Sequence, residues 1–398
     1  MGLIVPNKSR TEVCGYIYNL INSFRIGLKI MKKLLLGTSA LVAAGLVAGS
    51  AFAAEPNVSV GGFSNFQAGL VDQDSVFETG PNSRDFKTRS HNEVHVNVNG
   101  KADNGLGYGA VIELQADVTA SEDASGFNAD KSYIFLESGL GRAELGSNTD
   151  ASRALQVNSA TFARATGGVD GDWYYFVNTG GLAGTSAFII RPDLPTAHAK
   201  GAAEDANKFT YYSPRYSGFQ LGVSYTPDQG DAGNSVGFTG EANGNYENVW
   251  NLGLNYTGQF DQVGIAASAT GEWGESESAA VEDLNAYALG VNLTYGGFTV
   301  GGSYGDWQDS TFAVGATNSD ADYWDAGIAY ETGPYGVSLT YLDSSLASND
   351  FQNFSVGADY KLAPGLVPYI EANFFDLDDN AATTNDGSAI LFGTQLNF

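Results

Sequence analysis

The chain has 398 residues, of which 51 are Gly, 21 Tyr and 23 Phe, and charged residues make up only 16 %. Its formal net charge of −26 argues against nucleic acid as a partner, because a phosphate backbone is bound by a Lys/Arg surface. Outside the N-terminal region, no stretch reaches the roughly 20 apolar residues that a membrane-spanning helix needs. The length suits two ordinary domains or one large barrel, and the abundance of Gly and aromatic residues favours an all-β barrel.

Residues 31–53 have the features of an export signal. A Met-Lys-Lys start is followed by an apolar centre and an Ala-Phe-Ala cleavage site. Residues 1–30 are then expected to be an upstream extension, which a misassigned start codon would explain. The exported protein is predicted to comprise 54–398, with a formal charge of 13 minus 44, or −31.

Apolar and polar residues alternate in many segments of the exported chain, and the gaps between these segments are alternately short and long. Alternation with period two is typical of strands with two unlike faces. About sixteen strands are predicted. They lie near 58–71, 87–100, 106–117, 131–137, 141–147, 207–213, 218–226, 247–257, 260–272, 284–295, 298–307, 322–331, 335–343, 351–362, 366–375 and 387–398.

The two classes of connection predict a 16-stranded antiparallel transmembrane β-barrel with short periplasmic turns and long extracellular loops. Tyr or Phe often ends an apolar row, as Tyr287 and Tyr295 do, which suits an aromatic girdle at the membrane surface. A soluble β-sandwich or solenoid also alternates, but it explains the two loop classes poorly. The stretch 387–398 keeps one apolar face as far as Phe398, so we expect it to pair with the first strand and close the barrel.

Five stretches resemble the general-diffusion porins of Gram-negative bacteria, especially those of the alphaproteobacterial type. They are 58–63, 138–146, 207–214, 218–225 and the final Phe398. The resemblance implies a homotrimer in the cell outer membrane, in contact with lipid and lipopolysaccharide, that carries ions and small hydrophilic solutes. Phe398 resembles the signal that the barrel-assembly machinery reads.

The third long connection, about 148–206, is too long to lack structure without a reason. In the porins that the chain resembles, this loop folds into the barrel and narrows it. The resemblance thus assigns the acidic side of the constriction to Asp150, Asp170 and Asp172. The aromatic run 173–176 is either a stacking surface for solutes or an anchor to the wall, and anchoring is favoured. The run consists of Trp173, Tyr174, Tyr175 and Phe176.

The basic side of the constriction is predicted from strand parity. If the valines at 94, 96 and 98 face lipid, the alternate residues of the second strand face the lumen, as do two residues of the fifth strand. The basic side consists of Lys87, Arg89, His91, His95 and Arg142, and the inward-facing acids Glu93 and Glu144 belong to the acidic side. Cations opposite acids give a transverse field that orients dipolar solutes. The simpler alternative places Lys87, Arg89 and His91 at the rim as solvated charges and Asp170 and Asp172 in a polar turn.

No enzymatic activity, metal site or cofactor is expected. The Gly-x-Ser-x-Gly patterns at 233–237 and 301–305 lie in a loop and in a strand, not at a strand-to-helix turn. His91 and His95 are four strand positions apart, roughly 13 Å, too far for one zinc ion. The acidic loop clusters at 122–123 and 376–380 are candidates for weak Ca²⁺ binding, but solvated charge explains them more simply.

The sequence therefore predicts a porin that conducts passively and, given its negative charge, prefers cations. A porin specific for one sugar or amino acid is the main alternative. A barrel that serves as an adhesin or structural protein is a further one, although such a barrel would not need a long loop inside.

Overall fold

A computed structural model describes residues 55–75, 77, 84–117, 129–178, 187–198, 206–233, 246–379 and 384–398. The chain divides into a unit Met1–Ala53 and a compact unit Ala54–Phe398. The predicted upstream extension and export signal lie outside the described residues, as does the acidic pair at 122–123.

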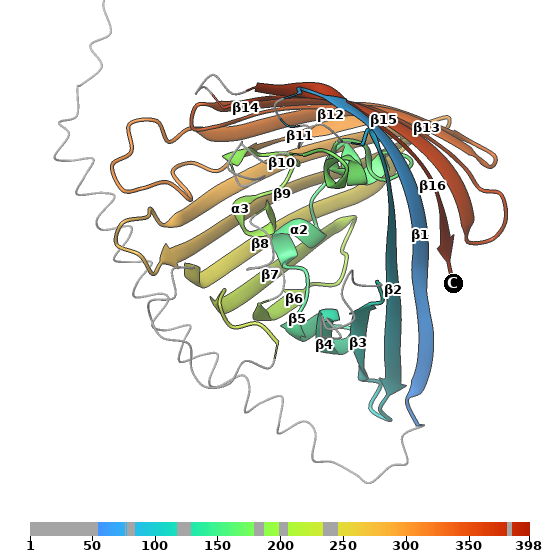
Figure 1. The fold of residues 1–398 in the computed structure, drawn as a ribbon. Coiled ribbons are helices and arrows are strands. Elements are labelled where there is room, and N and C mark those ends of the chain that lie inside the picture. Colours follow the sequence, from blue (N-terminus) through green and yellow to red (C-terminus); the bar gives the residue numbers. More distant parts are fainter. Residues whose placement is uncertain are drawn as a thin grey trace, which may run out of the picture. The chain divides into compact units, whose positions relative to one another are not determined.

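Sixteen antiparallel strands form one closed barrel in which each strand pairs with its neighbours in sequence (Figure 1). They are β1 (Asn57–Gln73), β2 (Phe86–Lys101), β3 (Gly107–Gln115), β4 (Ala129–Ser138), β5 (Gly141–Ser147), β6 (Asn207–Tyr212), β7 (Phe219–Asp228), β8 (Tyr246–Phe260), β9 (Val263–Ser276), β10 (Leu284–Tyr295), β11 (Phe298–Asp306), β12 (Ala321–Thr332), β13 (Tyr335–Leu346), β14 (Asn349–Tyr360), β15 (Leu366–Asp378) and β16 (Thr384–Asn397). The predicted barrel and its strand number are confirmed.

The barrel closes between β1 and β16, as the sequence predicts. Phe63 pairs with Asn397, and the backbones of Gly62 and Phe398 exchange hydrogen bonds of 3.0 and 3.1 Å. The predicted strand ends differ by up to a few residues. β16, for example, begins at Thr384 rather than 387, because its pairing with β15 starts before the outward apolar row begins.

The outer face of the barrel is apolar and exposed. On β10, Leu289, Val291 and Leu293 are exposed, whereas Ala288 and Asn292 at the alternate positions are buried. An apolar surface that encircles a closed wall needs lipid around it. Exposing apolar surface to water costs about 25 cal/mol of free energy per Å². The exposed side chains therefore mark the membrane-facing side.

The connection after β5 carries short helical elements. They are α2 (Ala151–Ala154), η1 (Ala160–Phe162), η2 (Gly168–Asp170), η3 (Asp172–Tyr175) and α3 (Pro195–His198). Among the residues that the structure describes, no helix is long and apolar enough to span a membrane.

The inner face of the barrel is not uniformly polar. A buried apolar cluster lies between the connection after β5 and the strands β10–β16. Within it the Trp173 ring stacks on Phe351 and Phe375, with ring centroids 5.7 and 5.4 Å apart. Phe374 and Phe375 are adjacent in β15, so one of them has to face inward, and Phe375 does.

Replacing Phe375 with Ala should therefore loosen the loop. We expect a loss of about 3–5 kcal/mol of stability from the cavity and faster protease cleavage between 148 and 206. Phe374→Ala, on the lipid face of the same strand, is the matched control. Limited proteolysis of the folded proteins, followed by mass spectrometry, measures the cleavage rate of the loop. Equal cleavage in both variants would contradict the anchoring role of Phe375.

Candidate functional site

The connection after β5 lies along the inner face of the barrel (Figure 1). Its α2 contacts β6–β9, η2 contacts β13–β15, and η3 contacts β16. These contacts involve β6–β9 and β13–β16, which are half of the sixteen strands. This segment, residues 148–178 and 187–198, is called the lumen loop below.

Two buried carboxylates of the wall hold the lumen loop. Glu272 of β9 accepts hydrogen bonds from the Ser152 hydroxyl at 2.9 Å and from the Thr196 backbone N–H at 3.1 Å. Glu371 of β15 accepts from the backbone N–H and hydroxyl of Thr166 at 3.0 and 2.7 Å. Both carboxylates are fully buried. Burying a charge is costly unless hydrogen bonds satisfy it. The loop supplies the donors for the wall carboxylates, and the carboxylates supply acceptors for the loop's N–H and hydroxyl groups.

Two further acids continue this attachment. Asp325 of β12 accepts from the Ser159 backbone N–H at 2.6 Å. Asp359 of β14 forms an ion pair with Arg164 at 2.8 Å, and Glu331 of β12 pairs with the same guanidinium at 3.0 Å. The loop is thus held at intervals by acids from β9, β12, β14 and β15.

Glycine makes room where the loop backbone crosses the wall. At three wall positions an added Cβ would meet a carbonyl oxygen of the loop. The distances would be 2.6 Å from Gly253 to Ala151, 1.6 Å from Gly290 to Val157 and 2.7 Å from Gly357 to Arg164. Side chains at these positions would push the loop inward.

The aromatic run packs mostly against the wall. Trp173 and Phe176 are buried, and the Phe176 ring lies where a side chain at Gly69 of β1 would be. Tyr175 is 37 % exposed. Its ring lies under the Arg89 guanidinium at 3.8 Å, and its carbonyl accepts a hydrogen bond from Lys87 at 2.8 Å. The run therefore joins the loop to β1 and β2.

The loop acids and the strand cations meet at this point. Arg89 pairs with Asp172 at 3.8 Å, and Gln67 of β1 hydrogen-bonds both residues. The two charges are in contact rather than on opposite sides of the opening. Their field is therefore that of a short dipole at the edge of the channel.

Asp170 is paired within the loop, with Arg191 at 3.2 Å. Burial, and then the neighbouring Asp193, raise the pKa of Asp170 to about 7, and Arg191 opposes this rise. Asp150 is buried and caps α2, where it accepts from the Arg153 backbone N–H at 3.0 Å. The three predicted loop acids thus have three different partners, and of these only Asp172 contacts β2.

The fifth strand supplies a second charged group on the lumen side. Arg142 pairs with Glu144 at 2.6 Å and with Glu137 at 3.2 Å. This group lines a hollow of about 610 Å³ between β3–β7 and the lumen loop. His91, Glu93 and His95 lie half-buried on β2, and the Glu93 carboxylate contacts both imidazoles.

Sequence reasoning missed the carboxylates and glycines that hold the loop. The available signal is an isolated acid at an inward position deep in a strand, as Glu371 is between Tyr369 and Asn373. Parity alone does not distinguish such an acid from one that faces water.

A closed barrel with an apolar exterior, and with one loop folded against its inner wall, defines a transmembrane channel protein. The model of the Gram-negative porin family matches residues 37–380, and the chain belongs to this family. It is accordingly an outer-membrane channel of a Gram-negative bacterium.

Two similar proteins are an uncharacterized protein and a porin. An uncharacterized protein of Rickettsia conorii is 28 % identical over 92 % of this chain and 100 % of its own length. A monosaccharide porin of a Halomonas species is 24 % identical over 50 % of this chain and 58 % of its own length.

Solved structures share the fold. An anion-selective porin from Comamonas acidovorans has a TM-score of 0.61 at 15 % identity and covers 86 % of this chain and 100 % of its own. A mutant of the Rhodopseudomonas blastica porin has a TM-score of 0.56 at 16 % identity, with the same coverage of both chains. At these identities the likeness extends to the fold alone.

The glycine contacts predict the effect of a small substitution. Gly290→Ala places a Cβ against the Val157 carbonyl, so we expect about 1–3 kcal/mol of destabilisation and a displaced loop with altered single-channel conductance. Gly264→Ala is the control, because its Cβ would be 3.5 Å from the nearest atom, an ordinary contact. Planar-bilayer recording compares the two, and identical conductance would show that the loop does not set the opening.

Proposed function

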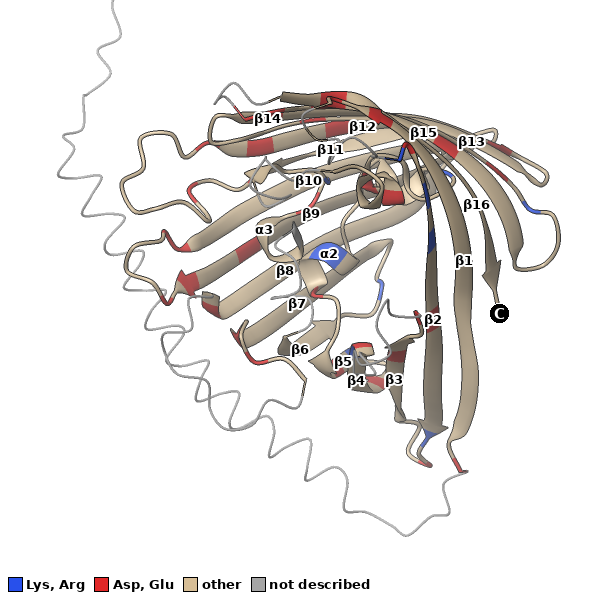
Figure 2. Cartoon of the chain, viewed as in Figure 1, with Lys and Arg blue, Asp and Glu red and all other residues tan. Residues whose placement is uncertain are grey.

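We propose that this porin carries ions and small hydrophilic solutes by passive diffusion and prefers cations. One observation carries the preference. Between 206 and 398 the only Lys and Arg residues are Lys208, Arg215 and Lys361, whereas acids occur on nearly every strand. Figure 2 shows acidic residues gathered at the strand ends around β8 and β9. A low-dielectric wall around a mouth of one sign raises the local concentration of counter-ions.

The constriction adds a local polar field to this overall charge. The ion pairs of Arg89 with Asp172 and of Arg142 with Glu144 place dipoles along the edge of the opening. Such a field orients water and polar solutes. An apolar solute that enters displaces this oriented water and gains little interaction energy with the field in return. Size and polarity, rather than a shaped binding site, therefore select the solute.

The sign of the selectivity does not follow from the fold, since the Comamonas protein is named an anion-selective porin. Strands β2, β4 and β5 contribute the basic residues Lys87, Arg89, Lys131 and Arg142 to one side of the lumen. Each of the last three has a carboxylate within 4.0 Å. Because neighbouring carboxylates compensate these three cations, the pairing supports an ion selectivity that is set by the other acids of the channel.

A solute-specific porin is the second candidate, and the relative named a monosaccharide porin favours it. A sugar site needs an open aromatic face on which the ring stacks. Tyr175 is the most exposed ring of the aromatic run, but the Arg89 guanidinium covers it at 3.8 Å. This contact favours general diffusion.

Selectivity is tested by the zero-current potential of the refolded protein in a planar bilayer under a salt gradient. We expect ohmic openings and a potential of the sign that cation flow requires. Absence of conductance from folded barrels would contradict the channel, and a potential of opposite sign would contradict the cation preference alone.

Arg89→Gln should raise the cation preference. Removing one charge about 6 Å from the path changes the energy of a passing ion by about 0.7 kcal/mol in water, which is a factor of about three in permeability ratio. Lys101→Gln, at the exposed end of the same strand, should change it little. An unchanged potential for Arg89→Gln would remove this residue from the constriction.

We further propose that the channel is a homotrimer, as in the porins that the chain resembles. The mass of the protein in detergent, measured by light scattering with the detergent subtracted, should equal three chains. A mass of one chain would contradict the proposal.

A further inference from the structure

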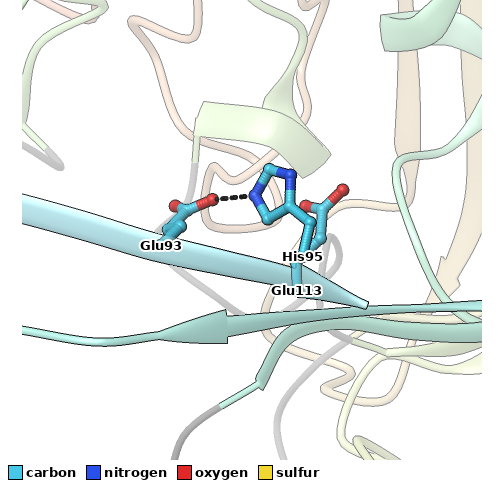
Figure 3. Close-up of side chains that lie close together, drawn as sticks. All are labelled: Glu93, His95 and Glu113. Carbon is cyan, nitrogen blue, oxygen red and sulfur yellow. Dashed lines mark hydrogen bonds and ion pairs between the residues drawn. The ribbon is translucent and has the colours of Figure 1, made fainter. Parts of the chain in front are cut away.

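Three potential metal ligands meet on the lumen side of β2 and β3. Glu93 and His95 are two positions apart on β2, so they share a face, and the ladder places Glu113 of β3 opposite His95. One ligand atom from each residue lies within 4.8 Å of the other two. Figure 3 shows the imidazole between the two carboxylates.

We propose that Glu93, His95 and Glu113 bind a divalent transition-metal ion such as Zn²⁺ in the channel wall. One imidazole nitrogen and two carboxylate oxygens suit Zn²⁺, whereas Mg²⁺ and Ca²⁺ prefer oxygen ligands alone. All three residues are half-buried and retain access to the lumen. Water from the channel completes the coordination.

The arrangement needs only a small movement to close on an ion. Ligand atoms at about 2.1 Å from one metal ion lie no more than about 4.2 Å apart. The Nε2 of His95 is already 2.8 Å from Oε2 of Glu93. The remaining adjustment is within the reach of side-chain torsions, since the three ligands stand on adjacent, hydrogen-bonded strands.

Neighbouring residues hold the ligands in place. His91 lies 3.4 Å from the other oxygen of Glu93, and the Phe63 ring of β1 packs edge-on against His91 and His95. Lys131 contacts Oε2 of Glu113 at 3.0 Å, which leaves Oε1 for a metal ion. Such outer contacts orient ligands and typically matter about 10- to 100-fold for metal affinity.

This site differs from the one that strand spacing excludes. His91 and His95 are too far apart along β2 to share an ion, but pairing with β3 brings a carboxylate beside His95. A bound Zn²⁺ would cancel the two negative charges of its ligands. We therefore expect metal binding to lower the cation preference of the channel, which rests on the proposed function, although the binding itself does not.

Binding is tested by titrating the refolded full-length protein in detergent with ZnCl₂ in a calorimeter. We expect one site, weakened more than about tenfold in both His95→Asn and Glu113→Gln. Glu137→Gln is the matched control, because Glu137 is a lumen acid outside the cluster. Circular dichroism and the heat-dependent shift on gels verify that each variant is folded.

Three results would overturn the proposal. Folded wild-type protein without a saturable Zn²⁺ site removes it, and so does an affinity that falls equally in Glu137→Gln, which would indicate diffuse binding to acids. The proposal would also fail if Mg²⁺ bound this site and its affinity were the same in His95→Asn as in the wild-type protein. A barrel that binds Zn²⁺ but does not conduct would contradict the channel and leave the metal site intact.

Discussion

The attachment of the lumen loop to buried carboxylates is the interaction on which the rest of the channel depends. Closure of the sheet satisfies the wall's backbone groups, but it leaves Glu272 and Glu371 facing the interior. The loop offers N–H groups and hydroxyls that need acceptors once they leave water. Each hydrogen bond to a charged group contributes about 1.5–3 kcal/mol, so several together hold a segment that has little regular structure of its own. Without them the lumen would be a wide, featureless pore.

The same geometry divides the charges of the interior into two kinds. Glu272 and Glu371 are buried under the loop, where they act on structure and hardly on passing ions. The charged residues near β2–β5, such as Arg89 and Arg142, retain access to water and pair with acids at the edge of the opening. The loop therefore separates the charges that it covers from those that remain accessible to water.

The wall was predictable and the attachment was not, for a physical reason. Lipid imposes one requirement on every strand, so the outward residues of β10 and β16 repeat it, and the sixteen strands follow from the sequence. The inward residues obey no shared rule. Asp150 caps a helix, Asp170 pairs within the loop and Asp172 reaches Arg89, although all three have the same chemistry and lie close together in sequence. Pairs such as Phe374 and Phe375 show where alternation forces an apolar side chain inward.

The path of the loop has a consequence for the order of folding. Apart from β1 and β16, strands that pair are consecutive in the sequence, but Thr166 and Glu371 are 205 residues apart. The acceptors that the loop needs are contributed by β9, β12, β14 and β15, so most of them do not exist together until the later half of the sheet has formed. Contacts of such separation form late, because closing long chain segments costs entropy before any bond repays it. The loop should therefore complete its docking only after β15 has joined the sheet, late in the assembly of the channel.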